Sequence, residues 1–340
     1  MTQPITIREA FAPAARRILV TGADGFLGRG LVAALARQAG VQLVLAMDLR
    51  EVPGDRREPG VRYVSQDVRD PGLSDTVANH QIDTVVHLAS IVTPAKGSNR
   101  EFEHSVDVGG TKNVLDACVQ HGVHHLVVSS SGAAYGYHVD NPEWLTEQHA
   151  LRGNQVFAYA HHKLLVEEML SGYRKEHPAL QQTVLRIGTI LGERVDNQIT
   201  ALFDKPRLIA IRGSKSPFVF IWDEDVVGAI LHAIGGRGLP GCYNLAGDGA
   251  LTIHEIAERL GKPIVNFPAW LLRGALSVAS VLGVSRYGPE QIDFLRYRPV
   301  LLNTALKQDF GFVPLKTSSM AFNAFVMSRA AQGRPVKAGC

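Results

Sequence analysis

A chain of 340 residues, 46% of them hydrophobic and 20% charged, is long enough for one large or two modest domains with a substantial buried core. This profile excludes an intrinsically disordered chain, a collagen and a coiled coil. The net charge of +3 is small and scattered along the chain, so we expect no nucleic-acid partner.

The first seventeen residues contain no apolar run of 7–15 residues and carry Glu9 among arginines, unlike a secretory or transit signal. We therefore expect residues 1–16 to form an N-terminal extension. Cys118, Cys242 and Cys340 lie far apart and show neither CxxC spacing nor a disulfide framework. Both features favour a reducing, cytoplasmic location.

From Arg17 onward, apolar runs of strand length alternate with amphipathic segments of helix length. This alternation predicts an α/β fold with a doubly wound, parallel Rossmann sheet. The predicted strands cover 18–22, 41–48, 61–67, 82–90, 124–131 and 183–192, and the predicted helices cover 26–40, 72–80, 108–122 and 157–177. Gly40 and Gly122 are expected to end two of these helices as C-terminal caps.

After residue 193 the alternation loosens, and proline, glycine and longer loops become frequent. Helices are still predicted over 223–236 and 251–261, and a return of the chain to the sheet is one option near 242–247. These features divide the chain into a Rossmann domain (17–192), a small C-terminal substrate lobe (193–330) and a tail (331–340).

The longest apolar stretch, residues 269–284, is shorter than the roughly 20 residues that span a bilayer, and it contains Arg273. We expect a buried or pocket-covering helix here rather than attachment to a membrane surface. No membrane partner is therefore predicted.

The segment TGADGFLG follows the first predicted strand and opens the first predicted helix. Its first glycine permits a sharp turn, its second lets a pyrophosphate approach the backbone, and its third lets the helix pack closely on the strand. The helix N-terminus then offers unpaired N–H groups to the anion. The predicted dinucleotide site contains Gly22, Asp24, Gly25, Phe26, Leu27 and Gly28, and the alternative is a purely structural turn.

Asp48 ends the second predicted strand, twenty residues after Gly28, where a carboxylate can accept hydrogen bonds from both ribose hydroxyls of adenosine. It would repel a 2′-phosphate, which favours NAD over NADP, although Arg50 would partly offset the repulsion. The alternative is a solvated aspartate at a strand end. Asp67 and Val68 follow the third strand and are predicted to bracket the adenine, by a hydrogen bond and by an apolar contact.

Tyr159 and Lys163 lie four residues apart in a predicted helix, which places both side chains on one face. An ammonium near a phenol favours the phenolate and lowers the pKa of a phenol from about 10, as a general acid–base near neutrality requires. Ser131 ends the fifth predicted strand, at the edge where doubly wound sheets bind ligands. Its hydroxyl is predicted to hold a carbonyl oxygen while Tyr159 exchanges a proton with that oxygen and a nicotinamide exchanges a hydride with the carbon.

The thirteen histidines form no metal motif, because neither HExxH nor Cys/His spacing occurs. His161 and His162 are adjacent, and on a helix such neighbours point about 100° apart. We therefore predict no metal, and we expect one of these two histidines to border the active site.

Together these motifs resemble the extended short-chain dehydrogenase/reductase superfamily, in the branch called NAD-dependent epimerase/dehydratase, over residues 16–325. The resemblance rests on TGADGFLG, Asp48, DVRD (67–70), HLAS (87–90), SSSGAAYG (129–136), YAHHK (159–163), LRIGTILG (185–192) and FIWDEDVV (220–227). It implies a Rossmann domain with a small C-terminal lobe, often in a homodimer joined through the helix of YAHHK and the preceding helix. It also implies a catalytic triad of Ser131, Tyr159 and Lys163, with Lys163 holding the nicotinamide ribose and Leu88, Ala89 and Ser90 at the nicotinamide.

Three departures from the family pattern concern the chemistry and the substrate. Asp107 replaces the usual asparagine before a glycine–threonine pair, so the proton-relay or helix-positioning role of that residue is open. Gly188 and Thr189 stand where sugar-nucleotide enzymes carry an asparagine-bearing segment. Ser216 stands near the place of the arginine that clamps a diphosphate, with Lys215 as the nearest cation.

The missing clamp and the aromatic residues Phe218, Phe220 and Trp222 favour a less charged substrate, unless these aromatics belong to the core. The predicted substrate residues are Gly132, Ala133, Gly188, Thr189 and Phe220. We therefore predict an NAD-dependent oxidoreductase that acts on a small molecule, a secondary alcohol or ketone. The alternatives are a nucleoside-diphosphate-sugar epimerase or dehydratase with tightly bound NAD, and a non-catalytic nicotinamide-sensing regulator.

Overall fold

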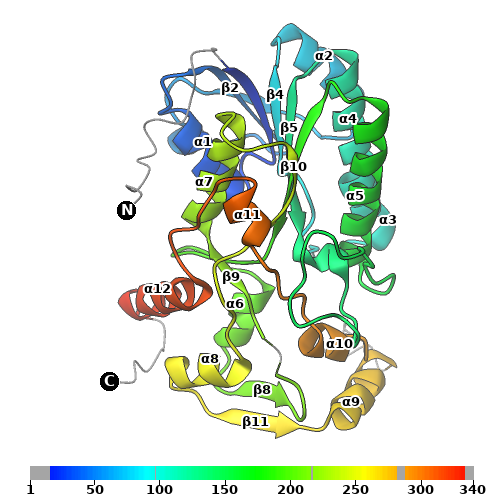
Figure 1. Cartoon of the computed structure of the whole chain (residues 1–340), viewed down its shortest axis with the longest axis vertical. Coiled ribbons are helices and arrows are strands. Elements are labelled where there is room, and N and C mark those ends of the chain that lie inside the picture. The colour runs from blue at the N-terminus through cyan, green and yellow to red at the C-terminus, as the bar shows by residue number, and fades with distance from the viewer. Residues whose placement is uncertain (1–15, 96, 216, 282–287, 334–340) are drawn as a thin grey trace.

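The computed structural model describes residues 16–95, 97–215, 217–281 and 288–333 (Figure 1). At its centre is a seven-stranded sheet in the order β10-β6-β5-β4-β1-β2-β3, in which all neighbours are parallel. The strands are β1 (Arg16–Thr21), β2 (Val41–Asp48), β3 (Arg62–Ser65), β4 (Thr84–His87), β5 (His125–Ser131), β6 (Gln181–Ile187) and β10 (Gly241–Leu245). The strand order reverses between β1 and β4, and the predicted doubly wound α/β fold is confirmed.

Helices cover both faces of the sheet, because successive residues of a strand point to opposite faces. Ile18 and Val20 of β1 pack into one core with α1 (Phe26–Leu35) and α7 (Asp223–Ile234), whereas Leu19 packs into a second core. The second core is closed by α2 (Leu73–Asn79), α4 (Gly110–Gln120) and α5 (Ala158–Glu176), on the other side of the sheet (Figure 1). The connections contain the 3₁₀ turns η2 (Gly54–Arg56) and η4 (Gly132–Tyr135), and helix α3 (Arg100–His104) with the π-helical turn η3 (Ser105–Gly109).

The segments after β6 build a smaller lobe around two pairs of short parallel strands. Strand β7 (Thr189–Leu191) pairs with β9 (Phe220–Trp222), and β8 (Leu208–Ile211) pairs with β11 (Ile264–Phe267). The helices of this part are α6 (Gln198–Phe203), α8 (Ile253–Leu260), α9 (Ala269–Val281), α10 (Gln291–Arg296) and α12 (Ser318–Ala331), whereas α11 (Thr304–Gln308) packs beside β10 through Leu306. Phe218, Phe220 and Trp222 are buried in the lobe, and the Phe220 ring stacks on both Phe218 and Phe322, so these aromatics belong to its core.

Two predicted features of the fold are wrong in detail. Helix α1 ends at Leu35 with Ala36 as its C-cap, so Gly40 caps nothing and instead precedes β2. The predicted strand 183–192 is two strands, because the chain leaves the large sheet at Gly188 and pairs with β9 from Thr189 onward. The predicted buried or pocket-covering helix of residues 269–284 is present as α9; none of its residues 269–278 is buried, residues 282–284 lie outside the described residues, and pocket covering stays a prediction.

Gly122 and β10 occupy the places that the sequence suggested for them. Gly122 adopts a left-handed conformation with φ of +64° just after α4, as a helix-ending glycine does. Strand β10 returns to the sheet beside β6. Residues 1–15 and 334–340, which hold most of the predicted extension and tail, lie outside the described residues, as does Ser216.

The buried side chain of His87 is expected to make the stability of the fold depend on pH. It is buried on β4, where its ring bonds to Thr21 Oγ1 at 2.8 Å and to Thr111 Oγ1 at 3.0 Å. Burial, and secondarily the charge of Lys163, lower the pKa of His87 to about 3, although Asp107 acts in the opposite direction. Between an unfolded pKa of 6.5 and this value the unfolded chain binds a proton that the folded chain does not. The free energy of unfolding should therefore fall as the pH drops through this window.

Urea unfolding of the wild type should show a loss of about 1–2 kcal/mol between pH 6.5 and pH 5 from this residue. The variant His87→Gln should lose less over the same interval, whereas His254→Gln, at an exposed position of α8, should follow the wild type. An equal pH dependence in His87→Gln and the wild type would contradict this assignment.

Candidate active site

The glycine turn lies between β1 and α1, at the carboxyl edge of the sheet. Gly22 has φ of +69°, and a Cβ atom there would lie 2.8 Å from the backbone N of Ala89. A Cβ atom on Gly28 would lie 2.2 Å from the carbonyl oxygen of Gly22, so only glycine lets α1 start this close to the turn. Helix α1 begins after Gly25 with no capping side chain and no acidic residue in its first turn. The turn and the helix N-terminus therefore form a cradle that suits an anion.

Asp48 lies beside this turn, because its Oδ2 accepts a hydrogen bond of 2.9 Å from the backbone N of Asp24. The buried carboxylate of Asp24 is in turn paired with Arg56 at 3.0 Å and faces Arg29 at 3.9 Å. Arg50 was expected to offset part of the repulsion between Asp48 and a 2′-phosphate. Its contact with Asp48 is made by the backbone N, at 3.4 Å from Oδ1, and not by the guanidinium. No sequence motif marks Arg56, which lies 32 positions after Asp24 in the chain and is brought to the glycine turn by the fold.

The loop after β4 approaches the same turn. The backbone N of Leu88 donates to the carbonyl of Thr21 at 3.2 Å, and that of Ala89 donates to the Thr21 hydroxyl at 3.3 Å. Residues 88–90 therefore follow β4 as a loop and not as the strand that was predicted, and they lie over Gly22.

Asp67 and Val68 both contact other residues of the protein. The carboxylate of Asp67 accepts hydrogen bonds from Arg69, at 2.6 Å from Nη2, and these bonds lower the pKa of Asp67 although burial opposes them. Arg69 continues to Ser105 Oγ at 3.0 Å. Val68 is buried against Gly110 at the start of α4. The structure thus pairs Asp67 with a cation that the sequence analysis did not assign.

Tyr159 and Lys163 lie together on α5. Lys163 Nζ is 5.6 Å from the centroid of the Tyr159 ring and donates to the carbonyl of Ser129 at 3.0 Å, which ties α5 to the strand that ends at Ser131. Ser131 caps η4, where its Oγ accepts a hydrogen bond of 3.1 Å from the backbone N of Ala133. Ser131 and Tyr159 make no direct hydrogen bond to each other, although both lie at this edge of the sheet.

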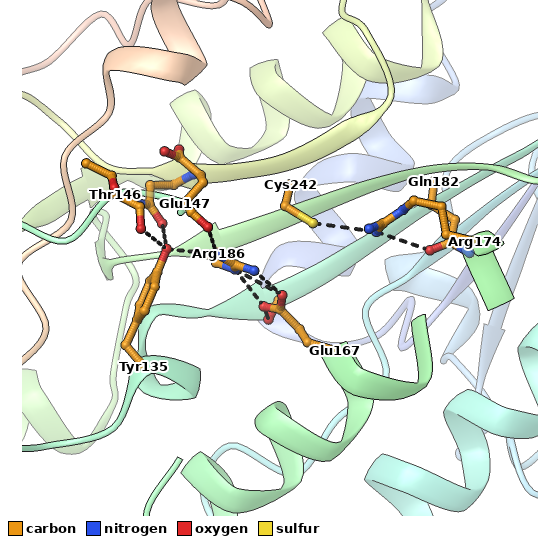
Figure 2. A network of polar contacts seen from close by, with 10 residues as sticks. Tyr135, Thr146, Glu147, Glu167, Arg174, Gln182, Arg186 and Cys242 are labelled. Atoms are coloured by element: carbon orange, nitrogen blue, oxygen red, sulfur yellow. Dashed lines mark hydrogen bonds and ion pairs between the residues drawn. The ribbon is translucent and has the colours of Figure 1, made fainter. Parts of the chain in front are cut away.

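A buried polar network holds α5 and β5 in place (Figure 2). Arg186 on β6 forms a forked pair with Glu167 on α5, at 2.7 Å from Nη2 and 2.9 Å from Nε to Oε2. Glu167 also accepts from the hydroxyl of Ser130, the neighbour of Ser131, and Arg186 Nη1 contacts Tyr135 Oη at 2.8 Å. Burial alone would lower the pKa of Arg186, but the bonds and charge of Glu167 raise it above the ordinary value.

The predicted substrate residues surround this edge. Gly132 and Ala133 form the buried start of η4. Gly188 donates its N–H to Leu245 at 3.0 Å and Thr189 donates to Val219 at 3.1 Å, so the two residues mark the point where the chain passes from the sheet to the lobe. Phe220 is fully buried in the core of the lobe. This is the core packing that the sequence left open as the alternative to a contact with substrate.

Arg298 is a cation near the site that the sequence analysis missed. Its Nε and Nη2 atoms are buried without a hydrogen-bond partner, and its guanidinium lies 3.7 Å from the centroid of the Phe218 ring. Burial lowers the pKa of Arg298 to about 9, against the influence of Tyr137. The Tyr137 ring packs against Phe157, the N-cap of α5, at 5.3 Å between centroids. Nothing in the local sequence around Arg298 distinguishes it from a surface arginine.

Two kinds of feature are absent from the described part of the chain. Within residues 16–95, 97–215, 217–281 and 288–333, no cluster of three or more His, Cys, Asp or Glu side chains is placed to hold a metal ion. In the same ranges, none of the helices combines the length and the apolar character needed to cross a bilayer.

The strand order and the glycine turn define a Rossmann-type α/β protein. The sequence matches the model of the NAD dependent epimerase/dehydratase family over residues 18–246, and the chain belongs to this family.

An uncharacterized protein of Mycobacterium tuberculosis is 26% identical over 318 residues, which cover 92% of this chain and 84% of that protein. Among solved structures, the UDP-glucose 4-epimerase of Thermus thermophilus in complex with NAD has a TM-score of 0.69 and 25% identity, covering 92% of this chain and 98% of that chain. The UDP-glucose 4-epimerase of Thermotoga maritima with UDP-glucose has a TM-score of 0.71 and 20% identity, covering 93% and 99%.

Proposed function

We propose that the chain is an NAD-dependent oxidoreductase that acts on a secondary alcohol or the corresponding ketone. The observation that carries the proposal is the placement of Tyr159 beside Lys163, which is bonded to the strand that ends at Ser131. NAD, when bound, supplies the acceptor or donor of a hydride.

Each of the three side chains has a separate task in this proposal. Tyr159 exchanges a proton with the substrate oxygen, and the Lys163 ammonium stabilises the phenolate that results. The oxygen of Ser131 already accepts a hydrogen bond from Ala133, so its O–H is free to donate to the substrate oxygen. The serine therefore polarises the carbonyl or fixes the alcohol while Tyr159 moves the proton.

The residues around the glycine turn fit a dinucleotide. The turn at Gly22 and the uncapped start of α1 would hold the pyrophosphate, and the Asp48 carboxylate would hold the adenosine ribose. Lys163 would hold the nicotinamide ribose, and residues 88–90 would lie at the nicotinamide. The homodimer through α4 and α5 and the cytoplasmic location stay predictions.

Asp48 should make the protein prefer NAD to NADP. In Asp48→Asn the amide still accepts the hydrogen bond from Asp24, but the charge that repels a 2′-phosphate is lost. We expect the ratio of the NADP and NAD dissociation constants to fall by about tenfold, as the loss of one charge contact allows. Quenching of intrinsic fluorescence by each cofactor measures both constants.

The control is Asp55→Asn, which removes a charge from the exposed 3₁₀ turn η2 nearby and should leave the ratio unchanged. An unchanged ratio in Asp48→Asn, or a wild type that prefers NADP, would contradict the assigned role of Asp48.

A second candidate function is the epimerisation or dehydration of a nucleoside-diphosphate sugar. Arg298 favours it, because a buried guanidinium with two unpartnered nitrogens suits a phosphate oxygen. This cation lies in the lobe whose diphosphate clamp was missing from the sequence pattern, and the similarity to the Thermus thermophilus epimerase points the same way. In this reaction the hydride leaves and returns to one substrate, so no net NADH forms.

One experiment separates the two functions. Purified protein is incubated with NAD and either a panel of secondary alcohols or UDP-glucose, and both NADH and the products are measured. NADH formed in proportion to a ketone supports the oxidoreductase. Conversion of UDP-glucose without net NADH supports the epimerase and overturns the first proposal, while cofactor binding without any turnover favours the regulator.

A further inference from the structure

Asp107 is a buried carboxylate in the π-helical turn η3, between α3 and α4. Its Oδ1 accepts hydrogen bonds from the backbone N of Ile91 at 2.8 Å and from Ser90 Oγ at 3.0 Å. Its Oδ2 contacts His162 Nδ1 at 3.1 Å. This carboxylate therefore joins the loop after β4 to α5, at the residue that precedes Lys163.

His162 contacts Asp107 through one ring nitrogen only. The ring is only 1% exposed, and its Nε2 is buried without a hydrogen-bond partner, with His104 packed edge-on at 5.4 Å. Nδ1 of His162 is therefore the ring nitrogen that meets the carboxylate, and the ring adds a single contact to Asp107.

The other groups around Asp107 leave Lys163 as its main electrostatic partner. Burial acts to raise the pKa of Asp107, but the bond from His162, the charge of Lys163 and the donors of the loop outweigh it and lower the pKa. His87 on β4 is neutral near pH 7, and α3 contributes the buried Glu103 and the exposed His104. On the outer side of α5, Arg100 is occupied with His161, at 3.3 Å. Lys163 is 6% exposed and lies next to His162 in the chain.

We propose that Asp107 is a positioning residue, whose carboxylate holds the loop at Ser90 and Ile91 against α5 and offsets part of the Lys163 charge that acts on Tyr159. This inference rests on the proposed function. The asparagine that is usual at this place in the family offers similar hydrogen bonds but no charge. Tyr159 should therefore form its phenolate at a higher pH in this chain than it would with asparagine at position 107.

The test is a pH titration of the tyrosinate ultraviolet absorbance of the full chain. Subtracting the titration of Tyr159→Phe from that of the wild type isolates the phenolate of Tyr159, and each Asp107 variant is paired with its own Tyr159→Phe double variant. In Asp107→Asn the midpoint should move to lower pH by about one unit or less, the size expected when one charge near Lys163 is removed from a partly polar site. Asp107→Ser removes the same charge with different hydrogen bonds and should give the same direction of shift.

Two histidine variants serve as controls. His162→Asn retains an amide donor and the charge of Asp107, and His161→Asn changes only the outer histidine, so neither should move the midpoint. A midpoint that stays in place in both Asp107 variants, or that moves as far in His162→Asn, overturns the inference. If instead Tyr159 of the wild type titrates with ordinary phenols, the proposed function itself fails, and the two failures are thus distinguishable.

Discussion

Replacing Tyr159 with phenylalanine is expected to slow hydride transfer by about 10²–10⁴-fold while NAD binding is retained. The side chain lies 5.6 Å from the Lys163 ammonium, measured to the ring centroid, so the phenol is the group whose proton that cation can mobilise. The ring itself remains in phenylalanine, and the packing of α5 should be unchanged. Single-turnover formation of NADH measures the chemical step, and fluorescence quenching measures NAD binding.

Tyr173→Phe is the matched control, because Tyr173 lies on the same helix and bonds to Asp116 away from the site. This variant should keep the wild-type rate. A Tyr159→Phe protein with the wild-type rate would show that another group moves the proton. If NAD binding to that variant also changed its interaction with a partner, the chain would be better interpreted as a nicotinamide-sensing regulator.

The sequence predicted best those features that depend on neighbours in the chain. Strand β2 has the predicted bounds, 41–48, because the apolar run of residues 43–47 ends in a single carboxylate, Asp48. The Tyr159–Lys163 pair also follows from local geometry, since a spacing of four on a helix brings two side chains to one face. These features need no information from the rest of the fold.

The sequence failed where a distant segment decides the outcome. The break at Gly188 arises because its N–H bonds to Leu245 while the next N–H bonds to Val219, and no local pattern encodes this change of sheet. For helix α9 the sequence left a buried and a pocket-covering helix open; Trp270 is 73% exposed, which is against the buried alternative, because apolar composition does not specify what a helix packs against.

The same limit applies to the candidate site. Asp107 was noticed as a departure from the family pattern, but its contact with His162 spans 55 positions and appears only in the fold. Arg298 carried no local signal at all. Arg186 offered a partial one, because an arginine inside a buried apolar strand requires a partner, and Glu167, one turn after Lys163 on the same helix face, is a carboxylate in the right place.

The buried pair of Glu167 and Arg186 gives the largest expected effect on stability. The two side chains are 3% and 7% exposed, so Glu167→Gln would leave the Arg186 guanidinium buried without its counter-ion. Breaking such a pair is expected to lower the free energy of unfolding by about 3–5 kcal/mol. Urea unfolding at neutral pH measures the loss. Glu168→Gln, at the exposed neighbouring position of α5, should change it by less than about 0.5 kcal/mol.

Replacing both Glu167 and Arg186 distinguishes the effect of this pair on stability from its effect on the positions of Tyr159 and Ser131. In the double variant Glu167→Leu/Arg186→Met no unpaired charge is left buried, so most of the lost stability should return. The rate of hydride transfer should not return with it, because Ser130 loses its bond to Glu167 on α5 and Tyr135 loses its bond to Arg186 on β6, and these bonds help to position β5 and η4. A double variant with the wild-type rate would show that packing alone positions Tyr159 and Ser131. A Glu167→Gln protein as stable as the wild type would show that water or another group compensates Arg186.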